Sequence, residues 1–495
     1  MNKTSFLEIM RALNKEELKR FEAFLNSPYF NTRNNVIKLF GLIKNHSPEF
    51  ENKMLDKEEL WKKLFPGKEY NYGIIKNIIY DITKLAERFL ETEGLNTDET
   101  QRMKYLLEKL GEKRLESIFF SKYNAYEKNN FQSSKYYYSY YEDYLKLKEL
   151  RFTAEAYNPK LHSKLFSHET AELLIFEFMS KFSNNYNSVY IEETEYNEKP
   201  DNEFIKFFSK TVFADSGLEK YIETLSEKHG RKYKPALIFF RLMKCYQNPH
   251  SFEIYFEFKK TLFDNDRYIA ESALRGLYAS LGSALDNCQD VAGINKNREL
   301  FDIISHLVEK KIFTSEDGKV VPTLYLLAVK TSGYLKEPAF IESLMKDFLP
   351  ATEPELKSNF GIFSQAYLNY AKGEYEQALD YSNKISIETF QMKYYLRNLQ
   401  IIISYEKDDF EMFKYMCDSY KHFLSKNKSV SHSYRESNMK FLNYTNTLFK
   451  LREALRVTKD KSEIGFTVNE LRKEVVVNKY WLIEKLNELS NPKMN

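Results

Sequence analysis

An all-α fold is predicted for this chain of 495 residues. Glycine and proline are scarce, at 15 and 12 residues, so the chain has few of the turn formers that a β-rich fold needs. Apolar residues recur at helical spacing along most of the chain. In the second half, bulky aromatic residues stand 35 residues apart, which indicates a repeated pair of helices. We therefore expect an N-terminal helical domain followed by an irregular α-solenoid of helical hairpins.

Residues 1–93 are expected to form a compact domain of five helices. Asn14 followed by Glu17 has the spacing of a capping box, and Asp56 followed by Glu59 repeats it. The fifth helix is predicted from Ile74 to Leu90 by its apolar stripe. The acidic, glycine-containing segment 91–99 is expected to break the helix and end the domain.

The segment 56–90 resembles the helix-turn-helix of winged-helix regulators, because a short helix is followed by Pro66-Gly67 and a longer helix. The resemblance implies DNA reading by the solvent face of the fifth helix. The candidate contact residues on that face are Lys76, Asn77, Lys84 and Arg88. Against this function, residues 1–95 carry 16 Lys and Arg against 14 Asp and Glu, and no wing hairpin is legible. The other interpretation is a helical domain that closes the end of the solenoid.

Residues 100–320 are expected to be a region of helical hairpins. Eleven aromatic residues lie between Phe119 and Tyr144, with lysines among them. This pattern is compatible with stacking on single-stranded bases, but we favour tyrosines packed between helices. Segment 228–235 is basic and has the order of a helix end and a new start, with Gly230 between them and Pro235 after. An anion-binding patch is the alternative for it.

Two further segments of this region carry an expectation. Residues 190–203 are acidic around Pro200, which predicts a solvated loop, with a docking site for a basic partner as the alternative. Residues 269–285 contain Gly276, Gly282 and several alanines, and small residues allow helices to approach closely. We therefore expect that helix to be an interior one.

Residues 321–456 contain the clearest hairpin. A helix around Ala366 is followed by Gly373, which can adopt a left-handed helix end, and by a helix from Tyr375 through Ala378. The two alanines allow the antiparallel helices to approach closely, and Tyr375 fills the space beside them. Phe340 and Phe410 stand 35 residues before and after Tyr375.

This hairpin resembles a tetratricopeptide repeat, a helix-turn-helix unit of about 34 residues. The resemblance implies stacked hairpins with a concave surface that binds a protein or peptide. Its packing anchors in this chain are Phe340, Ala366, Gly373, Tyr375, Ala378 and Phe410. Ile401 and Phe413 replace the expected small residues, and Phe390 replaces the closing proline, so irregular stacking is expected. Residues 457–495 are predicted to end in a capping helix over 480–486, preceded by a strand-like triplet, Val475–Val477.

No motif for catalysis or metal binding is found in the sequence. The eight histidines include no HExxH pattern, and no glycine-rich phosphate loop or GxSxG elbow is present. The three cysteines lie far apart and show no metal or redox spacing. We expect a protein that is not an enzyme and that needs no cofactor and no metal.

Charge and apolar runs give the expected partner and compartment. The formal net charge of +3 gives no bulk attraction to nucleic acid or to an anionic membrane. Unpaired cysteines suit a reducing compartment, Glu8 interrupts any apolar signal core, and the apolar runs are too short to cross a bilayer. A cytoplasmic scaffold for a protein or peptide partner is therefore expected. DNA regulation by residues 1–93, with the repeats as a sensor domain, is the alternative.

Overall fold

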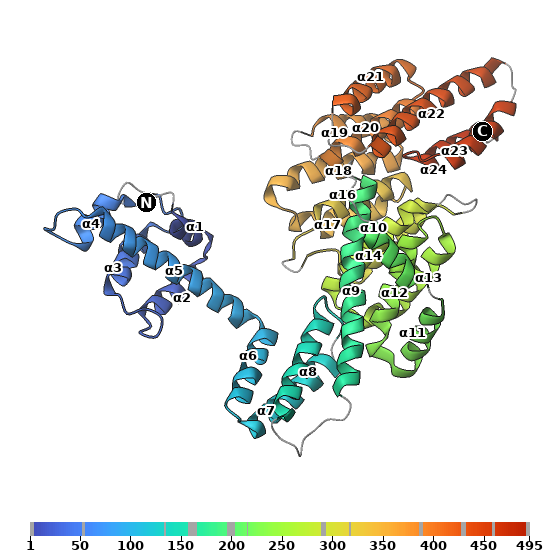
Figure 1. Ribbon diagram of the computed structural model, residues 1–495. Coiled ribbons are helices and arrows are strands. Elements are labelled where there is room, and N and C mark those ends of the chain that lie inside the picture. The colour runs from blue at the N-terminus through green and yellow to red at the C-terminus, as the bar shows by residue number, and fades with distance from the viewer. Residues whose placement is uncertain are drawn as a thin grey trace. The chain divides into compact units, whose positions relative to one another are not determined.

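The computed structural model confirms the all-α class (Figure 1). About 83% of the described residues are helical, most of them in 24 α-helices, and the described residues form no strand. The structure describes residues 4–51, 55–132, 135–156, 166–195, 203–214, 216–288, 294–315, 318–385, 390–426, 432–457 and 461–491. The chain forms two compact units, one of residues 1–125 and 146–163, the other of residues 126–145 and 164–495.

The core of the first unit lies among its first five helices, around one aromatic centre. The ring of Phe21 lies 5.1 Å from Phe40, 5.3 Å from Phe89 and 6.3 Å from Phe6, and all four side chains are buried. The helices of this unit are α1 (Ser5–Ala12), α2 (Lys15–Asn26), α3 (Asn34–Ile43), α4 (Lys57–Leu64), α5 (Tyr72–Thr97), α6 (Glu99–Glu112) and most of α7 (Glu116–Glu127).

The helix starts of this unit agree with the predictions in position and differ in detail. The capping box of Asn14 and Glu17 is complete, since each side chain accepts a hydrogen bond from the other residue's backbone N–H. Helix α4 begins after Asp56 without a side-chain cap hydrogen bond.

The predicted break at 91–99 is wrong, because α5 continues to Thr97 and only Asp98 separates it from α6. The Asp98 side chain accepts the Gln101 N–H and so starts the next helix.

The second unit begins with helices gathered around α12. Most of this helix is apolar, and its buried residues include the run from Pro235 to Phe240. It packs against α9, α10, α11, α13 and α14. The helices of this part are α8 (Tyr140–Ala156, shared with the first unit), α9 (Phe166–Glu195), α10 (Glu203–Phe213), α11 (Ser216–His229), α12 (Lys234–Gln247), α13 (Phe252–Asn265), α14 (Glu271–Asn287) and α15 (Lys296–Glu309).

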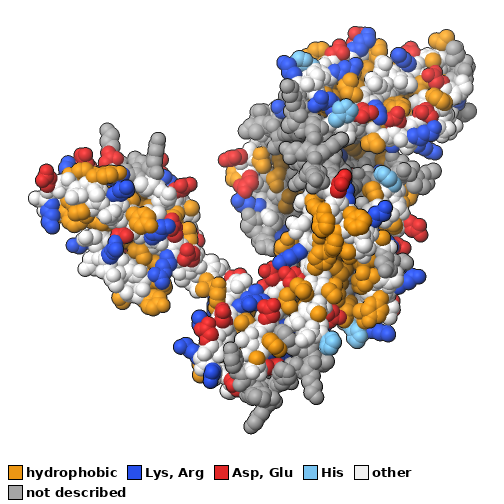
Figure 2. All heavy atoms as spheres, in the orientation of Figure 1, with side chains coloured by type: hydrophobic (Ala, Val, Ile, Leu, Met, Phe, Trp, Pro, Cys, Tyr) orange, Lys and Arg blue, Asp and Glu red, His pale blue; other side chains and the backbone are white. Residues whose placement is uncertain are grey.

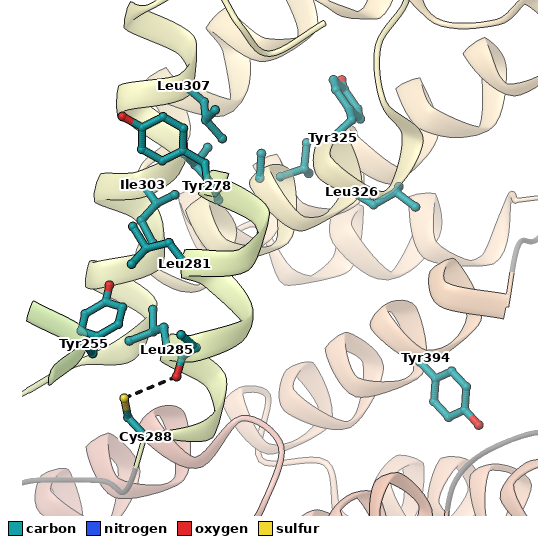
Figure 3. Close-up of a cluster of buried hydrophobic side chains, with 14 of the residues drawn as sticks. Tyr255, Tyr278, Leu281, Leu285, Cys288, Ile303, Leu307, Tyr325, Leu326 and Tyr394 are labelled. Carbon is teal, nitrogen blue, oxygen red and sulfur yellow. Dashed lines mark hydrogen bonds between the residues drawn. The ribbon is translucent and has the colours of Figure 1, made fainter. Parts of the chain in front are cut away.

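The prediction that 269–285 is an interior helix in close contact with its neighbours holds for one side of α14 only, the side that packs on α12, α13 and α15. Gly276 and Ala279 on α14 face solvent, and α14 buries only one side, which includes Tyr278 and Leu285 (Figure 3). The apolar run of α12 determines which helix is central, because burying branched and aromatic side chains gains more free energy than bringing small residues together. The prediction that 228–235 contains the end of one helix and the start of the next is confirmed. Helix α11 ends at His229, Gly230 has φ of 56° and Pro235 lies in the first turn of α12.

Helical hairpins follow in the rest of the unit. The pairs α16/α17, α18/α19 and α20/α21 are each packed together, and α16 also contacts α18, α18 contacts α20, and α20 contacts α22. Their bounds are α16 (Pro322–Tyr334), α17 (Pro338–Asp347), α18 (Pro354–Lys372), α19 (Tyr375–Asn383), α20 (Phe390–Glu406), α21 (Phe410–Lys426) and α22 (His432–Val457).

The three hairpin turns share one backbone design. Lys336, Gly373 and Asp408 each have a positive φ, of 56°, 81° and 58°. In each turn the next residue's N–H reaches back five residues: Glu337 to the Ser332 oxygen, Glu374 to Asn369 and Asp409 to Ser404, at 2.8–2.9 Å. The positive-φ residue also donates three residues back. This pair of bonds is the Schellman motif, which satisfies the last carbonyls of a helix. The prediction that Gly373 ends its helix in the left-handed conformation is confirmed.

Close approach between α16 and α18 depends on Gly333. A Cβ built on Gly333 would lie 2.6 Å from Cδ1 of Tyr367, closer than packed atoms come. Tyr367 is fully buried, and its hydroxyl donates to the Tyr395 carbonyl oxygen on α20 at 2.9 Å. One tyrosine of α18 thus fixes its distance to both neighbouring helices.

The C-terminal segment contains two helices where one was predicted, α23 (Ser462–Lys473) and α24 (Lys479–Ser490). Helix α24 packs on α22 and includes residues 480–486, where the capping helix was predicted. Val475 and Val476 lie in the irregular connection between the two helices and not in a strand.

Candidate functional site

A groove of about 930 Å³ is formed where α24 passes the start of α15 and the end of α16. Its volume is in the range of ligand sites in proteins. Its lining residues are Asn295, Asn297, Tyr334, Leu335, Tyr480, Trp481, Ile483, Glu484, Asn487, Glu488 and Asn491. All of them belong to the second unit.

Helix α24 is held in place by a buried carboxylate at the end of α20. Glu406 accepts a hydrogen bond from Trp481 Nε1 at 2.9 Å and pairs with Lys485 Nζ at 3.0 Å. The side chains of Lys485 and Glu406 are 7% and 11% exposed. Burial alone lowers the pKa of Lys485, but Glu406 and Glu488 outweigh it and raise that pKa above its ordinary value. The Lys485 ammonium therefore stays charged at neutral pH.

The groove presents amide and carboxylate groups that the fold itself does not use. The side chains of Asn297, Asn487, Asn491 and Glu484 form no hydrogen bond or ion pair with described residues. Each asparagine offers two N–H donors and a carbonyl acceptor, the groups that pair with a peptide backbone. The lining also includes two carboxylates, Glu484 and Glu488, and no lysine or arginine.

Tyr334 contributes to the groove lining, but its hydroxyl lies inside the protein. The hydroxyl is buried beside the side chains of Tyr367 and Asn478, and burial raises its pKa, so it keeps its proton. This hydroxyl therefore belongs to the packing beneath the groove and is not one of the groups that the groove offers to a ligand.

The predicted repeat anchors lie in the packing between helices and not in the groove. Ala366 and Ala378 are fully buried in the hairpin of α18 and α19, and the side of Tyr375 packs on the same core. The Phe340 ring lies 4.9 Å from Phe301, and the Phe410 ring 5.2 Å from Phe449. The side chain of Phe390 lies outside the described residues.

The four predicted DNA contacts do not form a continuous basic face on α5. Lys76 and Asn77 are exposed. Lys84 pairs with Glu87 at 2.6 Å, and the Arg88 guanidinium lies over the ring of Phe30 at 5.1 Å. Asp81 on the same helix pairs with Arg33. The charges of this face are mixed and largely used within the unit.

Most aromatic residues of 119–144 are unavailable for base stacking. Six are buried: Phe119, Tyr123, Tyr126, Phe131, Tyr136 and Tyr141. The backbone of Tyr136 also exchanges hydrogen bonds with the chain between α13 and α14, at 2.7 and 2.6 Å. The expectation that these rings pack between helices is confirmed. The predicted acidic loop at 190–203 is wrong at both ends, because α9 continues to Glu195 and α10 begins at Glu203, and residues 196–202 lie outside the described residues.

Sequence reasoning missed the groove. A signal was present on α24, where the polar residues Glu484, Asn487, Glu488 and Asn491 follow helical spacing opposite Leu482 and Leu486. The partners across the groove, Asn295 and Asn297, are far away in the sequence, so no local pattern connects them to α24.

Among the described residues, no cluster of His, Cys, Asp and Glu side chains has the arrangement to hold a metal ion. The described helices also include none that combines the length and apolar character needed to cross a bilayer. Scans against protein-family models, curated proteins and solved structures found no match to this chain.

Proposed function

We propose that this protein is a non-enzymatic interaction scaffold in the cytoplasm, and that the groove beside α24 binds an extended peptide segment of a partner protein. The hairpins α16–α21 resemble tetratricopeptide repeats and are proposed to stack as a short solenoid that carries α24. The observation that carries the proposal is the groove itself, with its asparagine amides and one carboxylate, Glu484, that form no hydrogen bond or ion pair with described side chains.

The charge of the groove indicates the partner. Glu488 is paired with Lys485, whereas Glu484 is exposed and pairs with no described residue. A lysine or arginine of the bound segment would complete this charge, and the asparagines would hold its backbone in register. The partner is therefore an extended segment with at least one basic residue. The mixed face of α5 gives no support to the alternative function, DNA regulation by residues 1–93.

The test is a selection of displayed random peptides on the full-length chain, followed by affinity measurement with the enriched peptides. We expect sequences with a basic residue, and about tenfold weaker binding to Glu484→Lys and Asn487→Ala. The matched controls are Glu463→Lys and Asn443→Ala, which alter exposed residues of the same types on α23 and α22. Enriched peptides that bind all four variants equally would show that the groove is not the site.

A further inference from the structure

A second surface of the same unit is apolar and lies away from the groove residues. Figure 2 shows hydrophobic side chains gathered over α9, α10 and α11. The exposed large apolar residues of these three helices are Leu174, Ile175, Phe178, Phe204, Phe207, Leu218 and Tyr221, and we call this set the aromatic surface. Phe204 and Phe207 are 78% and 73% exposed, which is unusual for phenylalanine.

Helix α9 has more apolar surface than its own unit covers. Its inner side buries Leu173, Phe176 and Met179, and the helix packs on α12. Its outer side carries Leu174, Ile175 and Phe178. A surface helix of a globular protein needs one apolar stripe, so the outer one is surplus to the fold.

Helix α10 continues the surface beside α9. The Phe208 ring lies 5.6 Å from both Phe178 and Phe182 and joins the two helices. Phe204 lies 6.2 Å from Phe208 and stands outward from this contact. The rings of Phe178, Phe208 and Phe204 are therefore in contact across α9 and α10, and the apolar side of another helix can lie on them.

At the border of the aromatic surface, carboxylates are paired within the unit, whereas two lysines are not. The carboxylates nearby are held by partners: Glu177 by Lys181 at 3.0 Å, Glu219 by Lys244 at 2.6 Å, and Glu223 by Arg241 at 2.8 Å. Lys210 and Lys220 are exposed and form no ion pair with described residues. The free charges on the border are therefore positive.

From these observations we infer that the aromatic surface binds an acidic amphipathic helix of a partner protein. The apolar side of that helix covers the exposed rings, and its flanking Glu or Asp side chains pair with Lys210 and Lys220. Apolar burial supplies most of the affinity, and the charges determine which helices are accepted and how fast they associate. This interaction is independent of the peptide groove.

The test uses the full-length chain and a labelled designed helix of 18 residues, with Leu and Phe on one side and Glu on both flanks. We expect micromolar binding that weakens as salt is raised from 50 to 300 mM. Two control peptides have the same length: one has the same residues shuffled so that no apolar side forms, and one has Lys in place of Glu. Both are expected to bind at least about tenfold more weakly.

Two pairs of substitutions locate the site. Phe204→Ser with Phe207→Ser should weaken binding about tenfold or more, because the exposed rings are lost. Lys210→Glu with Lys220→Glu should weaken it severalfold and remove its salt dependence. The matched controls are Phe466→Ser, at 68% exposure on α23, and Lys346→Glu, an exposed lysine on α17. Far-UV circular dichroism confirms that each variant is folded.

Three results would overturn the inference. The first is equal affinity for the designed helix and its shuffled control. The second is binding that neither pair of substitutions alters. The third is a different occupant: either a homodimer in light scattering that Phe204→Ser dissociates, or binding to vesicles of phosphatidylcholine and phosphatidylserine without binding to the helix. Unchanged binding of the selected peptides to Glu484→Lys would count against the groove proposal and leave this one unchanged.

Discussion

Gly373 ends helix α18 in a backbone conformation that glycine adopts without strain. It has φ of 81° at the end of α18, and no atom outside its chain neighbours lies within 4 Å of the position of an added Cβ. Any cost of a side chain there is therefore backbone strain and not a clash. The equivalent turn positions carry Lys336 and Asp408, whose φ angles of 56° and 58° lie in the same strained region. Asp408 is compensated by ion pairs with Arg452 at 2.9 Å and Arg456 at 2.5 Å.

We predict opposite effects of the same substitution at two glycines of the second unit. Gly373→Ala should lower the free energy of unfolding by about 1 kcal/mol, because alanine is strained in the left-handed region. Gly276→Ala, in the exposed interior of α14, should raise it by about 1 kcal/mol, because alanine is the better helix former. Urea unfolding followed by circular dichroism measures both. Changes of the same sign would contradict this explanation of the turn.

Helix α24 is the element on which the groove depends, and it is attached by the buried side chains of Trp481, Leu482 and Leu486 and by a buried ion pair. One carboxylate, Glu406, receives both the indole N–H of Trp481 and the ammonium of Lys485. Removing one member of a buried ion pair leaves the other charge unpaired, which costs more than removing both.

We predict that Lys485→Met and Glu406→Gln each destabilise the second unit by about 3 kcal/mol. The double variant should lose clearly less than the sum of the two. The measurement is urea unfolding by tryptophan fluorescence in a Trp61→Phe background, since the chain has two tryptophans and Trp481 then reports α24 alone. Lys414→Met, which removes an exposed pair with Glu411, is the control and should change stability by less than about 0.5 kcal/mol. Additive losses would show that the charges do not act as a pair.

Elements that follow from local sequence were predictable, and contacts between distant elements were not. The capping box at Asn14 and the helix end at Gly373 each involve a few consecutive residues, so their spacing alone predicts them. The choice of α12 over α14 as the central helix depends on how five neighbours compete for contact. The groove requires α24 to meet α15, and the aromatic surface requires knowing which apolar stripe of α9 is covered.

At the scale of the whole molecule, the chain has two separate cores. One contains Phe21 and its neighbours on α1–α5, and the other extends from Tyr136 to Leu486. Helix α8 belongs to both units, with residues up to 145 in the second and residues from 146 in the first. Independent cores unfold as separate cooperative transitions.

We predict two transitions in differential scanning calorimetry of the full chain. Phe21→Ala should lower the midpoint of one transition, and Leu281→Ala should lower the midpoint of the other, since each removes a fully buried side chain worth about 3–5 kcal/mol. Tyr29→Ala, at an exposed position of the first unit, should leave both midpoints in place. One transition that both core substitutions shift equally would indicate that the two cores unfold together.

The central position of α12 has a consequence for how the protein is made. The ribosome releases α12 before α13 and α14, so for a time the nascent chain exposes an apolar helix whose later neighbours have not yet been made. Such a segment adheres to other unfinished chains at moderate concentration. Synthesis of this protein therefore has a hazardous interval that begins near residue 247 and closes when the next two helices emerge, and slow translation across that interval would reduce the yield of intact molecules.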